Sequence, residues 1–197
     1  MKLVLALTAL PMASAFTAAP VGRLSTSIKA MVFYDSQTGN TEKCAEYIKE
    51  AAGIGMEYIG DASDDTIKGE DAIIVGAPTW HTGEDECRSG TSWDEWLYET
   101  LPNLGLDGKK VAIFGCGDQS SYSDYFCDAA GELYDQFTKA GAKIYGMTST
   151  DGYEHMSSKA EVDGKFVGLM FDEDNQYDMS EDRAKNWVAQ LKEEGFF

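Results

Sequence analysis

The chain has 197 residues, of which 43% are hydrophobic and 25% are charged, and its formal net charge is −18 at pH 7. This length and composition suit one globular domain and exclude a disordered chain. The acidic excess disfavours binding to nucleic acid or to anionic membrane surfaces, and it favours salt-sensitive docking onto basic faces of other proteins. A contribution to solubility alone is the alternative interpretation of this charge.

The first 29 residues differ in composition from the rest of the chain. Residues 1–15 combine a basic residue, an apolar run over 3–10 and small residues at 13–15, which predicts a signal peptide. Residues 16–29 hold hydroxyl and basic side chains and no acid, which predicts an organelle transit peptide. The apolar run is shorter than the ~20 residues that cross a bilayer, so we expect no stable membrane insertion.

The junction between these two segments predicts a destination. Its sequence, Ala-Ser-Ala-Phe at residues 13–16, resembles the presequences of nucleus-encoded plastid proteins in algae. We therefore expect import into the plastid (chloroplast) stroma and a mature domain over residues 30–197. That domain has a net charge of −21, because the removed residues carry three basic side chains and no acid. Secretion is the alternative, and the unpaired cysteines described below disfavour it.

From residue 30 onward, short apolar runs alternate with helical periodicity. The runs predict five strands, at residues 30–34, 56–59, 72–77, 110–114 and 143–147. Most of these runs are continuous, as in strands buried on both faces of a parallel sheet. The fold class is therefore α/β, a doubly wound five-stranded parallel sheet whose ligand site lies at the carboxyl ends of the strands.

Three stretches carry apolar residues at helical spacing, namely Cys44–Ala51, Phe126–Phe137 and Ala184–Leu191. Ser180 precedes the last of these and is expected to cap it. The long segment from Thr148 to Asp178 does not have a helical pattern, and it is interpreted as an insertion before the last helix.

The loop after the first strand has the residue types of a phosphate site. It consists of Ser36, Gln37, Thr38, Gly39, Asn40 and Thr41, and a helix follows near Glu42. Hydroxyls, a side-chain amide and backbone N–H groups at a helix N-terminus favour an anion. The loop lacks the lysine of a nucleotide-hydrolysing P-loop, so a terminal monophosphate fits better than a nucleoside triphosphate. An ordinary helix cap is the alternative.

Two further loops place aromatic residues at the same edge of the sheet. The loop after the third strand is Pro78, Thr79, Trp80, His81, Thr82 and Gly83, and the loop after the fourth runs from Gly115 to Tyr122. A flat ring system could stack between Trp80 and Tyr122 while its phosphate occupies the first loop. Each aromatic taken alone is more often a packing residue.

The cysteines and histidines occur without the short paired spacings of metal or dithiol sites. They are Cys44, Cys87, Cys116, Cys127, His81 and His155. We therefore expect no metal site, and thiols that stay reduced.

Taken together, the three loop motifs resemble flavodoxins. The matching stretches are T-G-N-T-E after the first strand, P-T-W-x-x-G-E after the third and G-x-G-D-Q-x-x-Y after the fourth. Similarity continues through G-K-F-V-G-L, D-E-D-N-Q and W-V-A-Q-L, and so covers about residues 30–193. The late insertion resembles that of the long-chain type, as in plastid flavodoxins of algae.

The resemblance implies the strand order 2-1-3-4-5 and one bound FMN. It implies a phosphate on Ser36–Thr41, Trp80 on the inner face of the flavin ring and Tyr122 on the outer face. It also implies further cofactor contacts from Pro78, Thr79, His81, Thr82, Gly83, Cys116, Gly117, Asp118, Tyr125, Cys127 and Asp174, with Gln119 and Asp124 near the pyrimidine edge and ribityl chain. The segment Glu84–Ser92 is longer than the common pattern, and the resemblance assigns it no role.

By the same resemblance, the chain is a monomeric, low-potential one-electron carrier. Its partners would be photosystem I and ferredoxin-NADP reductase or other ferredoxin-dependent proteins, where it takes the place of ferredoxin. The peptide between His81 and Thr82 is expected to accept a hydrogen bond from flavin N5 after one-electron reduction. Two alternatives stay open: an NAD(P)H:quinone reductase-type FMN enzyme, and a phosphate-binding module without flavin.

Overall fold

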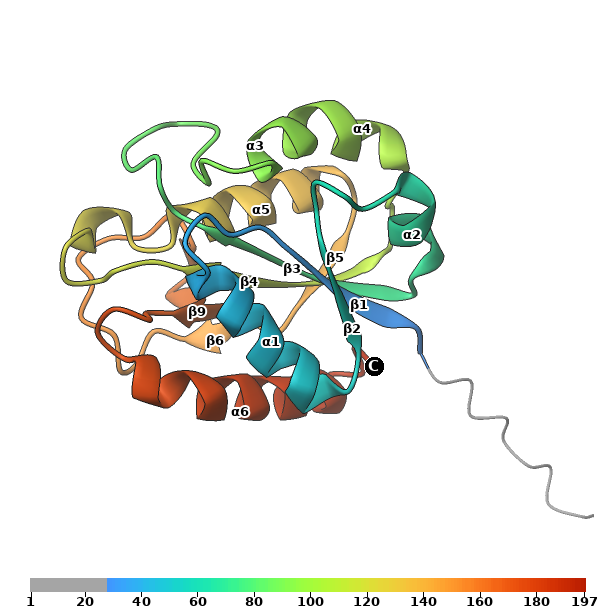
Figure 1. Ribbon diagram of the computed structural model, residues 1–197. Coiled ribbons are helices and arrows are strands. Elements are labelled where there is room, and N and C mark those ends of the chain that lie inside the picture. Colours follow the sequence, from blue (N-terminus) through green and yellow to red (C-terminus); the bar gives the residue numbers. More distant parts are fainter. Residues whose placement is uncertain (1–27) are drawn as a thin grey trace, which may run out of the picture.

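The computed structural model describes residues 28–197 as a parallel β-sheet between two layers of helices (Figure 1). The predicted signal peptide and all but the last two residues of the predicted transit peptide lie outside the described residues. Those two, Ile28 and Lys29, already contact the domain, since the Lys29 carbonyl accepts hydrogen bonds from the amides of Asp71 and Ala72. Within residues 28–197, no helix is long and apolar enough to cross a membrane.

The elements follow one another in alternating α/β order. They are β1 (Ala30–Tyr34), α1 (Asn40–Ala52), β2 (Gly55–Tyr58), α2 (Asp64–Gly69), β3 (Ala72–Pro78), α3 (Trp93–Glu95), a π-helical turn (Trp96–Thr100), α4 (Leu101–Leu104), β4 (Lys110–Cys116), a 3₁₀ turn (Ser123–Tyr125), α5 (Asp128–Lys139), β5 (Lys143–Tyr145), β6 (Thr148–Ser149), β7 (Glu161–Val162), β8 (Lys165–Phe166), β9 (Leu169–Phe171), a second 3₁₀ turn (Tyr177–Met179) and α6 (Ser180–Glu193).

The main sheet has the strand order β2-β1-β3-β4-β5, and all its pairings are parallel, which confirms the predicted fold class. The central strand β3 is buried along its whole length, as its unbroken apolar sequence predicts. Helices α1 and α6 cover one face, while α5 and the α3–α4 region cover the other (Figure 1). The carboxyl ends of β1, β3 and β4 therefore open onto one edge of the sheet, where the three loops meet.

The fifth position of the sheet is split between two segments. β5 pairs with residues 110–112 of β4, and β9 pairs with residues 114–116 of the same strand. The predicted fifth strand stops at Tyr145 because Gly146 takes a φ of +78°, a left-handed conformation that ends the extended chain. The insertion thus interrupts the fifth strand, and residues 169–171 return to the sheet before α6.

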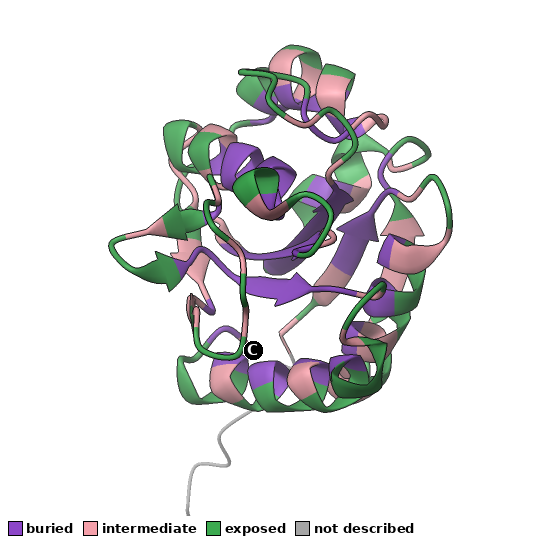
Figure 2. Ribbon diagram, turned by 90° about the vertical axis from the view of Figure 1, so that its left-hand side faces the viewer, coloured by how far each residue is buried: buried purple, intermediate pink, exposed green. Residues whose placement is uncertain are grey.

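The insertion forms a small antiparallel sheet, β6-β8-β7, and it packs against α5. Its backbone comes so close to Gly131 of α5 that a Cβ there would lie 2.2 Å from the carbonyl oxygen of Lys159. Asp128 of α5 accepts a hydrogen bond from the Lys159 amide at 2.8 Å. The first six residues of α5, 128–133, are accordingly all buried, and exposed residues occur only in the second half of the helix. Figure 2 shows the buried strands at the centre of the domain and the exposed residues on loops and outer helix surfaces.

Two of the helix predictions differ from the structure. Ser180 does not cap α6, because the 3₁₀ turn Tyr177–Met179 leads directly into the helix and makes Ser180 its first residue. The Ser180 hydroxyl is buried without a hydrogen-bond partner. Phe126 precedes α5, which begins at Asp128.

Candidate functional site

The three loops enclose a pocket of about 450 Å³ at the carboxyl ends of β1, β3 and β4. This volume lies within the ~300–1,000 Å³ range of small-molecule sites. Its lining consists of Ser36, Gln37, Thr38, Asn40, Thr41, Pro78, Thr79, Trp80, Thr82, Cys116, Gly117, Asp118, Tyr122, Glu173 and Asp174. No lysine or arginine is among these residues, so the anion site predicted at the first loop would rely on neutral donors.

Most of the predicted site residues thus lie together, but Gln119, Asp124 and the five residues described next are not part of the lining. Gly39 caps α1, and Gly83 packs near the ring of Tyr125, where an added Cβ would lie 3.6 Å away. His81 projects toward the Cys87 carbonyl, and Cys127 is fully buried beneath Gly117. Glu173 lines the pocket although sequence reasoning did not select it; its signal was its place inside the D-E-D-N-Q stretch.

The first loop is shaped by its own polar groups. Gly39 has a φ of +94°, which a residue with a Cβ adopts only with strain, and its amide donates to the Ser36 hydroxyl at 2.9 Å. The Ser36 amide donates to Asp35, which is 2% exposed. The loop therefore leads into the N-terminus of the 13-residue helix α1, where unpaired N–H groups and the helix dipole favour an anion.

Trp80 and Tyr122 form aromatic sides of the pocket and are 45% and 54% exposed. Large aromatic side chains are usually more buried, so two half-exposed rings on one pocket indicate a surface made to be covered. Tyr122 is held by the turn beneath it. The carbonyl of Asp118 accepts the Tyr122 amide, while the Asp118 carboxylate accepts the amides of Ser120 and Ser121, both at 2.9 Å.

Asp172 organises the far side of the pocket. It is fully buried, and one carboxylate oxygen accepts hydrogen bonds from the amide and the side chain of Gln119. The other accepts the amides of Asp174 and Asn175. Asp172 thus joins the loop that carries Tyr122 to the segment that carries Glu173 and Asp174.

Lys43 lies beside this wall and is already paired with an acid. Lys43 Nζ lies 2.8 Å from Glu173 Oε2, and this hydrogen bond is the main reason that the pKa of Lys43 rises well above its usual value. The second oxygen of Glu173 is buried with no hydrogen-bond partner in the structure. The pair ties the start of α1 to the segment after β9, at the end of the pocket near the first loop.

Within residues 28–197, no group of three or more His, Cys, Asp or Glu side chains is arranged to hold a metal ion. Cys44 and Cys116 lie next to each other, with 3.5 Å between their sulfur atoms. Burial raises the pKa of the Cys44 and Cys127 thiols well above the usual value, so these groups stay protonated.

Two acids of the pocket have pKa values displaced in opposite directions. Burial acts to raise the pKa of Asp118, but hydrogen bonds from Ser121, Asn175 and Ser120 outweigh it and leave that pKa below its usual value. Burial raises the pKa of Asp174, and the negative charges of Asp118, Asp172 and Glu173 raise it further. Asp118 therefore stays ionised to lower pH than Asp174.

We expect Asp118→Asn to lower the pKa of Asp174, because it removes a neighbouring negative charge. The stability that Asp118 contributes is present above its unfolded pKa of ~3.9 and is lost as the pH falls through its lower folded pKa. The variant should therefore have a smaller free energy of unfolding than the wild-type chain only above that pH range. Because Asp118 is partly exposed, the loss at pH 7 should be under about 1 kcal/mol. Carboxyl carbon-13 titrations and urea unfolding at pH 7 and pH 3 measure both effects. An unchanged Asp174 titration would contradict the coupling of the two acids.

Comparison with known proteins identifies the family. The family model described as Flavodoxin matches residues 32–187. Flavodoxins of Trichodesmium erythraeum and of Nostoc sp. PCC 7120 are each 44% identical, over 84% and 85% of this chain and 97% and 98% of their own length. A crystal structure of Fusobacterium nucleatum flavodoxin bound to flavin mononucleotide superposes with a TM-score of 0.75 at 29% identity, covering 85% of this chain and 99% of that one. The chain belongs to the flavodoxin family, whose members are electron-transfer proteins rather than enzymes.

Proposed function

We propose that the chain binds one FMN in this pocket and carries single electrons at low potential. The observation that carries the proposal is the pairing of two half-exposed aromatic rings with a helix N-terminus in one pocket whose lining contains no lysine or arginine. The solved relative from Fusobacterium, which was crystallised with flavin mononucleotide, supports the same ligand.

The residues present fit FMN. The Ser36–Thr41 loop offers hydroxyls and helix N-terminal amides to the phosphate, while Trp80 and Tyr122 offer ring faces to the flavin. Gly117 lets the loop that lines the pocket pack directly on Cys127, since a Cβ at this position would lie 2.9 Å from the Cys127 amide nitrogen. Cys116, Asp118 and Asp174 also line the pocket and would lie beside the bound cofactor.

The bound FMN would supply the redox chemistry, and the chain would set the conditions for it. The acids on the pocket wall oppose additional negative charge in a partly desolvated site, which lowers the potential of the step that creates such charge. Trp80 and Tyr122 would exclude water from the ring faces of the bound cofactor. The backbone between His81 and Thr82 would offer its carbonyl to flavin N5.

The aromatic walls give the first test of FMN binding. Trp80→Ala and Tyr122→Ala should each weaken FMN binding about 5- to 150-fold, because one stacking partner is worth ~1–3 kcal/mol. Tyr177→Ala is the matched control, since Tyr177 is exposed and lies outside the pocket lining. The measurement is FMN titration of the apoprotein by fluorescence quenching. A colourless wild-type chain that does not take up FMN would overturn the proposal.

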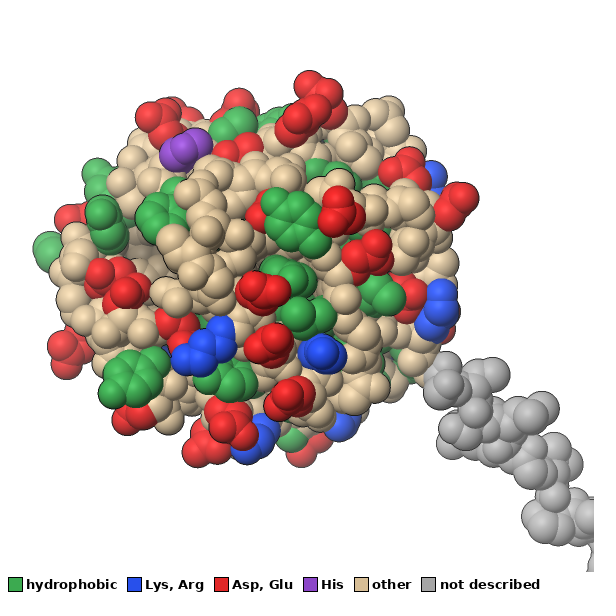
Figure 3. Space-filling view, viewed as in Figure 1, with side chains coloured by type: hydrophobic (Ala, Val, Ile, Leu, Met, Phe, Trp, Pro, Cys, Tyr) green, Lys and Arg blue, Asp and Glu red, His purple; other side chains and the backbone are tan. Residues whose placement is uncertain are grey.

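We infer photosystem I and ferredoxin-NADP reductase as partners, with this chain in place of ferredoxin. The charge supports this inference, because Asp and Glu outnumber Lys and Arg on the face shown in Figure 3, which suits basic docking surfaces. The association rate of the FMN-loaded chain with ferredoxin-NADP reductase should fall roughly tenfold between low and 0.3 M salt. Electron transfer to an uncharged small acceptor is the control and should stay constant. A salt-independent rate with the reductase would refute electrostatic docking.

We also propose that residues 1–29 direct the chain to the plastid stroma. The family model begins only at residue 32, and the cyanobacterial relatives are matched almost completely by about 85% of this chain, which supports an additional N-terminal segment. A fusion of residues 1–29 to a fluorescent protein should accumulate in the plastids of an alga whose plastids are surrounded by additional membranes. A fusion of residues 16–29 alone should not. Secretion of the first fusion would contradict the proposal.

A further inference from the structure

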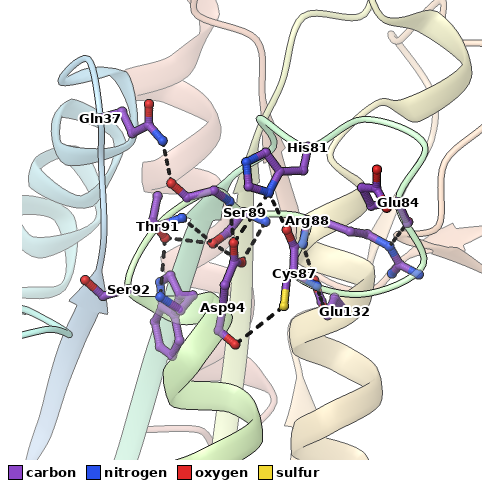
Figure 4. Close-up of polar contacts among 12 residues, drawn as sticks. Gln37, His81, Glu84, Cys87, Arg88, Ser89, Thr91, Ser92, Asp94 and Glu132 are labelled. Carbon is purple, nitrogen blue, oxygen red and sulfur yellow. Dashed lines mark hydrogen bonds and ion pairs between the residues drawn. The ribbon is translucent and has the colours of Figure 1, made fainter.

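The extended segment Glu84–Ser92, to which the family pattern assigns no role, is held in a dense set of polar contacts (Figure 4). Arg88 is buried, and its guanidinium donates to the carbonyls of Glu84 and Asp85 within the same segment. Asp94 accepts the amides of Ser89 and Gly90 at 3.0 and 2.9 Å. The segment is thus a defined loop whose backbone is fixed by hydrogen bonds along its length.

One buried acid attaches this loop to the body of the domain. Glu132 of α5 is 2% exposed, and its two carboxylate oxygens accept the amides of Cys87 at 2.7 Å and Arg88 at 2.8 Å. The hydroxyl of Tyr98 donates to the same carboxylate. Two successive backbone amides that converge on one anion form a nest, and Cys87 takes a φ of +57° to make it.

Arg88, whose amide donates to Glu132, also contacts the backbone at the edge of the pocket. The Arg88 carbonyl accepts the amides of Trp80 at 3.1 Å and His81 at 3.0 Å. The His81 ring adds a contact of 2.7 Å from Nδ1 to the Cys87 carbonyl, and since a carbonyl only accepts, Nδ1 carries the proton. A continuous series of hydrogen bonds therefore runs from α5, through residues 87 and 88, to the backbone that carries Trp80 and the His81–Thr82 peptide.

We propose that Glu132 is a positioning residue for the FMN site, because it fixes the Arg88 carbonyl that orients the backbone of Trp80 and His81. This inference rests on the proposed FMN function and extends it to a side chain that does not line the pocket. Its consequence is a larger separation between the two one-electron potentials of bound FMN, because the peptide that would face flavin N5 is kept in place.

The first test is Glu132→Gln in the FMN-loaded chain. In the observed geometry each amide has its own carboxylate oxygen. A glutamine side chain in the same position would place its N–H₂ group against one of the two amides, and two donors cannot pair. The difference between the two one-electron potentials sets the comproportionation constant of bound FMN. We expect this constant to fall roughly tenfold in Glu132→Gln, which is the scale of one lost buried hydrogen bond. Asp135→Asn, an exposed acid on the same helix, is the matched control and should leave both potentials unchanged.

A second variant separates position from charge. Glu132→Asp keeps the negative charge but is one methylene shorter, so it too should decrease the difference between the two one-electron potentials of bound FMN. Loss of charge alone would instead raise both potentials together, because it removes Coulomb repulsion from the reduced cofactor. If Glu132→Gln changes the potentials and a folded Glu132→Asp does not, the effect is electrostatic and the positioning role is refuted. Unchanged potentials in both variants also refute it, even if thermal stability falls.

Hydrogen exchange tests the same connection without FMN. In the apoprotein, the amides of Trp80, His81, Cys87 and Arg88 should be protected, and in Glu132→Gln their protection should fall roughly tenfold while that of β3 is unchanged. Unprotected Trp80 and His81 amides in the wild-type apoprotein would overturn the inference even if neither variant folds. Failure of the wild-type chain to bind FMN would instead overturn the proposed function, and the exchange result would still stand.

Discussion

The shape of the pocket depends on buried carboxylates that accept backbone amides from the loops around it. Asp35 accepts the amides of Ser36 and Ser92, Glu132 accepts those of Cys87 and Arg88, and Asp172 joins Gln119 to Asn175. Loops at the carboxyl ends of parallel strands have no neighbouring strand to satisfy their N–H groups, and a carboxylate can accept several of them. These contacts attach each loop to a neighbouring loop, helix or segment at the edge of the pocket.

The same contacts explain why the acidity of the chain matters beyond solubility. Their donors are backbone amides, side-chain amides and the Tyr98 phenol, which satisfy the oxygens without cancelling the charge. The pocket wall thus keeps net negative charge close to the cofactor site, and Lys43, the cation beside it, is already paired with Glu173. A site built in this way opposes accumulation of negative charge on a reduced ligand and suits a carrier of low potential.

The three loop motifs could be brought together from the sequence because each loop directly follows a strand, so topology alone places Ser36, Trp80 and Tyr122 at one edge of the sheet. The split fifth position was missed because β5 and β9 have three residues each, too few for a periodic signal. Glu132 and Asp172 were missed for a different reason. An acid among helical or loop residues is normally solvated, and only the tertiary structure shows that its partners are distant amides.

The length of the loop at residues 84–92 can be understood from the same principle. Lengthening a loop costs little, since a doubling adds only about 0.6 kcal/mol of closure entropy. A longer loop nevertheless leaves the backbone at Trp80 and His81 more conformations unless it is fixed at several points. Asp94, Glu132 and the Gln37 side chain, which donates to the Gly90 carbonyl, supply those points from α3, α5 and the first loop. The anchors therefore permit the extra length without loss of precision at the site that the loop surrounds.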